Sequence, residues 1–218
     1  MGNSFPGSAL TRALLHPATW QLGPLVVAGT SELLRAGLES FSHAWSRLML
    51  GRSCQVLVLG LDGVGKTTLL YRLQANEHVP TFPTIGFNVE TFRAGEIEFT
   101  VWDLGGDARI RRLWHLYFAR ADAVVFVVDA TDRERLSLAK QELQRVMKSD
   151  ELRDAKLLVC ANKQDAPDAM AADDVRRALA VDDWYQHPTH VQGITASNGD
   201  GVSDALQWLS DQLLPRQQ

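Results

Sequence analysis

The sequence is poor in cysteine, has no excess of basic residues and contains no long apolar run. Its two cysteines, Cys54 and Cys160, lie far apart in apolar segments, which is typical of reduced core thiols rather than of a disulfide or metal pair. The six histidines show no His-x3-His spacing, so we expect no zinc site built by the protein. The formal net charge of -4 indicates no nucleic-acid partner, because nucleic-acid surfaces are usually basic.

A membrane-spanning helix needs ~20 consecutive apolar residues, and no segment of this chain reaches that length. Residues 8–30 come closest, and they are interrupted by Arg12, His16, Pro17, Gln21 and Pro24. The prolines also break the apolar core that a secretory signal peptide requires. We therefore expect a cytoplasmic protein without a spanning helix.

The N-terminal part differs in composition from the rest of the chain, which fits one domain with an appendage. Residues 1–30 are rich in Gly, Pro, Ser and Thr and have no sustained period, which predicts a flexible extension. Residues 31–50 predict an amphipathic helix, with Ser31 as its N-cap and Gly51 as its stop. Its apolar positions recur at steps of three and four: Leu34, Leu38, Phe41, Trp45 and Leu48.

Residues 51–214 alternate between β-rich runs and helical patterns, which predicts one folded domain before a tail at 215–218. The runs 123–129 and 156–160 are apolar without alternation, as expected of parallel strands covered on both faces. A hairpin-sized turn separates the runs 87–92 and 97–103, so these two strands should pair antiparallel. We predict an α/β doubly wound, mostly parallel six-stranded sheet with one antiparallel edge hairpin. Its other strands are expected at 54–60 and 190–195, and its helices at 66–75, 108–119, 134–149, 171–180 and 202–213.

A glycine-rich loop, GLDGVGKTT, lies between an expected strand and an expected helix. In that context the pattern G-x4-G-K-[ST] predicts a phosphate loop, whose backbone N–H groups surround phosphates at a helix N-terminus. Lys66 can reach the β- and γ-phosphates, and the hydroxyl of Thr67 can bind Mg²⁺. ATPases and kinases share this motif, so it does not select the base. The expected phosphate-binding residues are Gly60, Leu61, Asp62, Gly63, Val64, Gly65, Lys66, Thr67 and Thr68.

A second motif, NKQD at 162–165, follows an apolar strand and favours guanine. The Asp165 carboxylate can accept hydrogen bonds from both N1–H and the 2-amino group of guanine, whereas adenine would leave it unpaired. Asn162 can donate to N7 of the base, and the stem of Lys163 can cover the ring. Downstream of the last expected strand, Ala196 can offer its backbone N–H to guanine O6.

The motifs continue along the chain as GLDGVGKTTLLYRL (60–73), PTIGFNVETF (83–92), TVWDLGG (100–106), FVVDATDRER (126–135), ELRDAKLLVCANKQD (151–165) and GDGVSDALQWLSDQL (199–213). In content and spacing they resemble the Arf/Arl (ADP-ribosylation factor-like) family of P-loop small GTPases over roughly residues 50–213. This resemblance implies a regulatory switch that binds Mg²⁺ and cycles between GDP and GTP in membrane traffic. It also implies a guanine-nucleotide exchange factor, a GTPase-activating protein and effector proteins as partners.

The same resemblance implies roles for single residues. Thr84 matches a threonine that binds Mg²⁺ and the γ-phosphate together with Thr67. Asp103 matches a carboxylate near a Mg²⁺-bound water, and Gly106 matches the backbone N–H that senses the γ-phosphate. An effector surface is implied at Ile85, Gly86, Phe87, Trp102 and Tyr117, although core packing explains Phe87 and Trp102 equally well from the residues alone.

One position departs from the family pattern within the expected catalytic group of Lys66, Gly106 and Asp107. Position 107 normally carries a glutamine that orients the attacking water, but here it is an aspartate, which has no N–H to donate when ionised. Its charge either repels the γ-phosphate or turns away to pair with Arg109, Arg111 or Arg112. In both cases we expect slow hydrolysis, and the alternative is a GTP-binding interaction module with negligible hydrolysis.

The N-terminus departs from the pattern too. The chain begins MGNSFP, so Gly2 is available for myristoylation, but Pro6 stands where the consensus has Ser or Thr, which leaves acylation open. In the family an amphipathic helix is displaced toward the membrane when the hairpin changes register, and reversible association with cytosolic faces of Golgi or endosomal membranes is implied. Residues 31–50 could act in this way or pack permanently on the core.

These two alternatives predict different membrane behaviour. If the helix at 31–50 is released by GTP, the protein will co-sediment with liposomes more strongly with a non-hydrolysable GTP analogue than with GDP. Equal co-sedimentation in the two nucleotide states would show that the helix is not switched.

Overall fold

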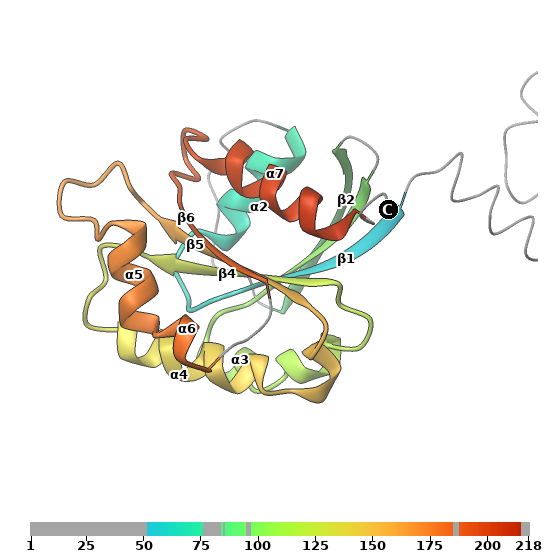
Figure 1. Ribbon diagram of the computed structural model, residues 1–218, viewed down its shortest axis with the longest axis horizontal. Coiled ribbons are helices and arrows are strands. Elements are labelled where there is room, and N and C mark those ends of the chain that lie inside the picture. The colour runs from blue at the N-terminus through green and yellow to red at the C-terminus, as the bar shows by residue number, and fades with distance from the viewer. Residues whose placement is uncertain (1–51, 76–83, 85, 95–96, 185–187, 215–218) are drawn as a thin grey trace, which may run out of the picture. The chain divides into compact units, whose positions relative to one another are not determined.

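Figure 1 shows the computed structural model, which describes residues 52–75, 84, 86–94, 97–184 and 188–214. Gly2, the extension at 1–30, the helix expected at 31–50, Ile85 and the tail at 215–218 lie outside the described residues. The boundaries expected for these segments therefore remain predictions.

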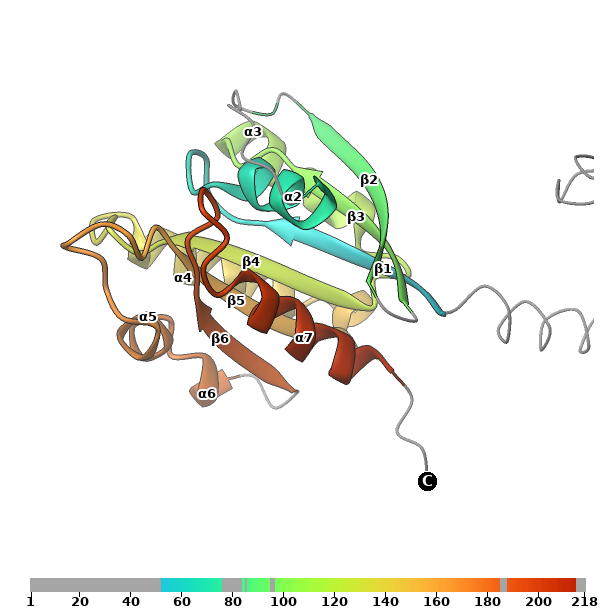
Figure 2. The same ribbon diagram turned by 90° about the horizontal axis from the view of Figure 1, so that it is seen from above.

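The described residues form a six-stranded sheet with the strand order β2-β3-β1-β4-β5-β6, seen from above in Figure 2. Only β2 and β3 pair antiparallel, and every other neighbouring pair is parallel. The predicted fold class is confirmed, including the antiparallel hairpin at one edge. The strands are β1 (Arg52–Leu59), β2 (Phe87–Ala94), β3 (Ile97–Leu104), β4 (Ala123–Asp129), β5 (Lys156–Asn162) and β6 (Thr189–Gly193).

Helices cover both faces of the sheet (Figures 1 and 2). One face carries α2 (Lys66–Ala75) and α7 (Val202–Leu213), and the other carries α4 (Leu136–Met147) and α5 (Ala172–Leu179). The shorter elements are α3 (Ala108–Arg111), η1 (Trp114–Tyr117), η2 (Asp150–Leu152) and α6 (Val181–Trp184). The central strands are enclosed by these layers, because all seven residues of β4 are buried and β5 is buried from Leu157 onward.

The helix expected at 108–119 is wrong, since two short helices, α3 and η1, replace it. Arg111 and Trp114 are both buried, and both donate to carbonyls of the preceding Gly105–Gly106 segment. The turn between the two helices lets both side chains point back toward that segment. Packing around residues 105 and 106 thus overrides the local helical pattern.

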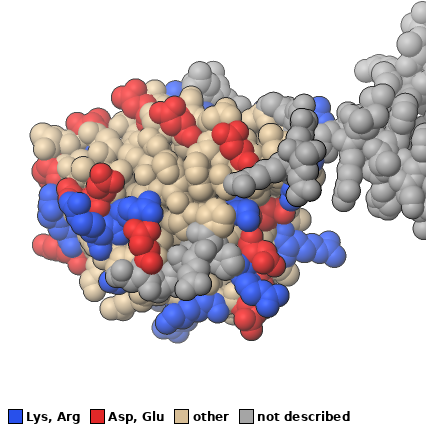
Figure 3. Space-filling view, in the orientation of Figure 1, with Lys and Arg blue, Asp and Glu red and all other residues tan. Residues whose placement is uncertain are grey.

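The described residues also bear on membranes and on surface charge. None of their helices is both long and apolar enough to cross a bilayer. On the face shown in Figure 3, basic and acidic side chains lie interspersed around an uncharged central area.

The burial of Cys54 and Cys160 predicts that their thiols react slowly in the folded protein. Burial raises the pKa of Cys160 to about 12, and it also raises the pKa of Cys54. Because the thiolate is the reactive form, we expect both thiols of the folded protein to alkylate at pH 8 roughly a hundredfold more slowly than in denaturant. Iodoacetamide labelling followed by mass spectrometry measures these rates. Rapid labelling of either cysteine in the folded protein would contradict the enclosed core.

Candidate nucleotide-binding site

The phosphate loop connects β1 to α2 and lies tightly against its neighbours. Gly60 adopts a φ of 143°, and a Cβ at this position would overlap the carbonyl oxygen of Val127 on β4. Gly65 has a φ of 96°, and its Cβ would overlap the side chain of Asn162. Glycine is required at both positions by conformation and by space. The loop is therefore held between β4 and the loop after β5.

Lys66 begins α2, and it is buried although it carries an ammonium group. Its Nζ donates to the carbonyl oxygen of Leu61 over 2.7 Å, so its hydrogen bond in the structure is to a backbone carbonyl. Burial lowers the Lys66 pKa to about 8, although the charges of Asp103 and Asp62 act in the opposite direction. A desolvated ammonium at a helix N-terminus is well placed to attract an anion.

Three oxygen-bearing side chains from separate elements meet beside this loop. The hydroxyls of Thr67 and Thr84 lie 2.9 Å apart. Both approach the same carboxylate oxygen, because Thr67 donates to Asp103 Oδ2 over 2.5 Å and Thr84 donates to it over 3.3 Å. Asp103 is fully buried near the end of β3, and burial raises its pKa while the two threonine hydroxyls oppose that rise. Thr84 and Thr67 therefore meet although they are 17 positions apart in the sequence.

The second oxygen of Asp103 decides whether Mg²⁺ fits here. Asp103 Oδ1 is buried and has no hydrogen-bond partner, which is costly unless a further donor approaches it. Mg²⁺ prefers oxygen ligands and retains several waters, so two hydroxyls with a carboxylate behind them fit a partly hydrated ion. Among the described residues, no group of three or more His, Cys, Asp or Glu side chains could hold a metal. Mg²⁺ commonly takes part of its coordination from water and from the phosphates of a bound ligand.

Gly105 and Gly106 link this cluster to the hairpin and to the phosphate loop. The N–H of Gly105 donates to the carbonyl of Gly86 over 2.9 Å, next to the start of β2. A Cβ on Gly106 would overlap the backbone of Leu61 and Asp62, so only glycine permits this approach. The segment that contains Asp103 and Gly106 therefore touches both the residues around Thr84 and the phosphate loop.

Asp107 has a role that its sequence pattern did not reveal. It is the N-cap of α3, and its carboxylate accepts hydrogen bonds from Arg109 N over 2.6 Å and Ile110 N over 3.1 Å. The bonds from the backbone N–H groups of Ile110 and Arg109 lower the Asp107 pKa, so it is ionised at neutral pH. The hydrogen-bond partners of Asp107 are thus backbone N–H groups rather than the arginine side chains that we expected. Arg111 bonds Glu142 and the Gly106 carbonyl instead.

The end of β5 is joined to the phosphate loop and to Ala196 by the side chain of its last residue. Asn162 donates through Nδ2 to the carbonyl of Val64 over 2.7 Å, and its Oδ1 accepts from the N–H of Ala196 over 2.9 Å. The N–H of Ala196, which we expected to face guanine O6, thus has a protein partner in the structure and would have to share or exchange it. Lys163 adopts a left-handed φ of 68°, and the carboxylate of Asp165 is exposed.

Three side chains at this site were missed from the sequence. Asp129 ends β4 and accepts from Lys163 Nζ over 2.5 Å and from the hydroxyl of Thr131 over 2.7 Å. Its place as the polar residue that ends the apolar run 123–129 could have indicated Asp129. Arg72 on α2 donates to the carbonyls of Ala196 and Ser197, and Arg135 donates to the carbonyl of Asp62. Both arginines lie within sequence stretches that resemble the family, but no role was expected for either.

The predicted aromatic trio comes together as a cluster. Phe87, Trp102 and Tyr117 have ring centroids 5.5 to 5.6 Å apart in all three pairs. Phe87 is 53% exposed, whereas the other two are half-buried. Trp102 and Tyr117 also pack against the hydrophobic core, so the cluster joins the core to an exposed phenylalanine at the surface. Gly86 precedes the cluster with a φ of 99°.

Comparison with known proteins agrees with this geometry. A solved structure of the Arl6 (BBS3) small GTPase from Trypanosoma brucei, with the bound nucleotide analogue GppNp, is similar to this chain with a TM-score of 0.69 and 35% sequence identity. The match covers 74% of this chain and 97% of that chain. The sequence model of the ADP-ribosylation factor family matches residues 41–213. With most of its length matched, the chain belongs to the ADP-ribosylation factor family.

Proposed function

We propose that the protein is a regulatory GTPase, which binds GTP and GDP in turn and signals through its conformation. The observation that carries this proposal is the meeting of Thr67, Thr84 and Asp103, with one buried carboxylate oxygen left without a donor. A phosphate-bound Mg²⁺ and its waters would satisfy that oxygen. The solved relative binds a GTP-like analogue, which supports the same ligand class for this chain.

Within this proposal each part of the site has one task. The phosphate loop with Lys66 would hold the phosphates, and the hydroxyls of Thr67 and Thr84 would hold Mg²⁺. When bound, the ion would supply neutralisation of phosphate charge. Asn162, Lys163 and Asp165 hold the guanine base, with Ala196 beside O6 once its N–H is shared.

Loss of the γ-phosphate would release two connected segments. Thr84 lies on one segment and Gly106 on the other, and the Gly105–Gly86 hydrogen bond joins them. Without the γ-phosphate, Thr84 and the Gly106 N–H would lose the group that holds them, so the two segments could separate from the phosphate loop. The exposed cluster of Phe87, Trp102 and Tyr117 lies next to both segments and is the surface that effectors would sense.

We propose weak intrinsic hydrolysis, with Asp107 as the cause. Its carboxylate already accepts two backbone hydrogen bonds at the start of α3 and offers no N–H to a water. Lys66 and the N–H of Gly106 remain available to stabilise charge on the γ-phosphate, and an arginine from an activating protein would restore part of the rate. The second candidate function, a GTP-binding interaction module with negligible hydrolysis, rests on the same residue.

Partners and location follow from family membership as proposals. They comprise an exchange factor, an activating protein, effectors at the aromatic cluster, and cytoplasmic Golgi or endosomal membranes reached through residues 31–50 with or without myristoylated Gly2.

Guanine recognition can be tested on the exposed carboxylate of the base loop. We expect Asp165→Asn to weaken GDP binding by roughly tenfold or more, because the amide cannot accept from both guanine donors. Titration with a fluorescent GDP measures the affinity. Asp168→Asn is the matched control, since Asp168 is also exposed on this loop. Equal losses in both variants, or none in Asp165→Asn, would contradict the assignment.

Substitutions at position 107 can separate its effect on GTP hydrolysis from its effect on the capping of α3. We expect Asp107→Gln to raise single-turnover GTP hydrolysis by roughly tenfold, because its amide can orient water. The same change removes the cap of α3, so thermal stability should fall slightly. Asp107→Ser keeps a capping oxygen without an amide and should leave both stability and rate nearly unchanged. A rate that does not rise in Asp107→Gln would sink the proposal.

A further inference from the structure

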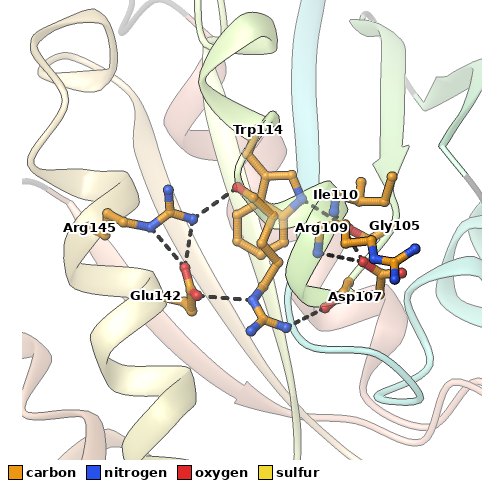
Figure 4. Close-up of polar contacts among 9 residues, drawn as sticks. Gly105, Asp107, Arg109, Ile110, Trp114, Glu142 and Arg145 are labelled. Atoms are coloured by element: carbon orange, nitrogen blue, oxygen red, sulfur yellow. Dashed lines mark hydrogen bonds and ion pairs between the residues drawn. The ribbon is translucent and has the colours of Figure 1, made fainter.

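A partly buried ionic network lies beside the glycine pair and does not belong to the nucleotide site (Figure 4). Arg111 Nε donates to Glu142 Oε1 over 2.9 Å, and Arg145 donates to Glu142 Oε2 over 2.6 Å. Arg145 also donates to the carbonyl of Arg111 over 2.9 Å. Glu142 and Arg145 lie on α4, whereas Arg111 ends α3. The network therefore joins α4 to the segment that follows Gly106.

The network and a neighbouring tryptophan fix two consecutive peptide groups. Trp114 Nε1 donates to the carbonyl of Gly105 over 3.1 Å, and Arg111 donates to the carbonyl of Gly106 over 2.7 Å. A trans peptide group is planar, so its N–H points opposite to its C=O. Holding the Gly105 carbonyl from behind therefore aims the N–H of Gly106 forward, and holding the Gly106 carbonyl fixes the next peptide group.

Arg111 can hold its place only because Glu142 neutralises it. The Arg111 side chain is 10% exposed and that of Glu142 is 15% exposed, so both charges are largely removed from water. Removing one partner of such a pair leaves an unpaired buried charge, which is strongly unfavourable. Without the carboxylate, the guanidinium of Arg111 would move toward solvent and release the Gly106 carbonyl.

We propose that Glu142 and Arg145 of α4 act, through Arg111, as positioning residues that hold the Gly106 carbonyl and so keep Gly106 where its N–H, aimed by the Trp114 bond to Gly105, meets the γ-phosphate and favours the GTP state. This inference rests on the proposed GTP-binding function. GDP has no γ-phosphate, so its affinity does not depend on the aim of this N–H. Weakening the network should therefore lower GTP affinity selectively.

The experiment compares Glu142→Gln with the wild-type protein. We expect the Kd for GppNp to rise by roughly fivefold or more relative to the Kd for GDP, a typical size for coupling between separate sites. Both constants come from displacement of a fluorescent nucleotide, and thermal melts check folding. Asp182→Asn is the matched acid-to-amide control, because Asp182 pairs with Arg176 away from this network. Its ratio of the two constants should equal that of the wild type.

Each result has a definite meaning. An unchanged ratio in Glu142→Gln, or an equal loss of both affinities, would show a merely structural role and overturn the inference. Should Glu142→Gln fail to fold, Arg145→Gln takes its place, since Arg145 is about half exposed, and an unchanged ratio there is equally decisive. A wild-type protein that binds neither nucleotide would refute the proposed function itself.

Discussion

The site depends above all on one buried carboxylate, that of Asp103. It receives the hydroxyls of Thr67 and Thr84, of which the first lies on α2 and the second lies before β2 in the sequence. Burial alone would favour its protonated form, so the two hydroxyls and the nearby Lys66 ammonium are needed to stabilise the charge. Because both threonine hydroxyls donate to the same oxygen of Asp103, the position of this carboxylate near the end of β3 determines where Thr67 and Thr84 meet.

Around this carboxylate the loops are joined by bonds between side chains and backbone. Asn162 links the phosphate loop to Ala196, Arg72 links α2 to the same region, and Arg135 reaches the carbonyl of Asp62. Such bonds fix backbone orientation, and backbone N–H groups are what a phosphate or a purine edge contacts. The protein thereby preorganises the polar groups of the candidate site on its loops.

The sequence was a good guide where chemistry requires particular atoms at fixed spacing. The loops at 60–68 and 162–165 could be placed because each follows an apolar run that had to be a buried strand. The break between α3 and η1 could not be foreseen, because it depends on where Arg111 and Trp114 find acceptors in the folded chain. The hydrogen bond from Ala196 to Asn162 is likewise a property of tertiary contact rather than of motif.

Position 107 serves two demands that no single side chain meets equally well. Starting α3 favours a short acceptor, whereas guiding a water favours a longer amide donor. A chain with glutamine at position 107 would need another residue to cap α3. Faster hydrolysis without loss of the cap would therefore require a second substitution. Substitutions at position 107 are then expected to occur together with substitutions at neighbouring positions. A substitution of residue 107 that changes the hydrolysis rate would also change the stability of α3.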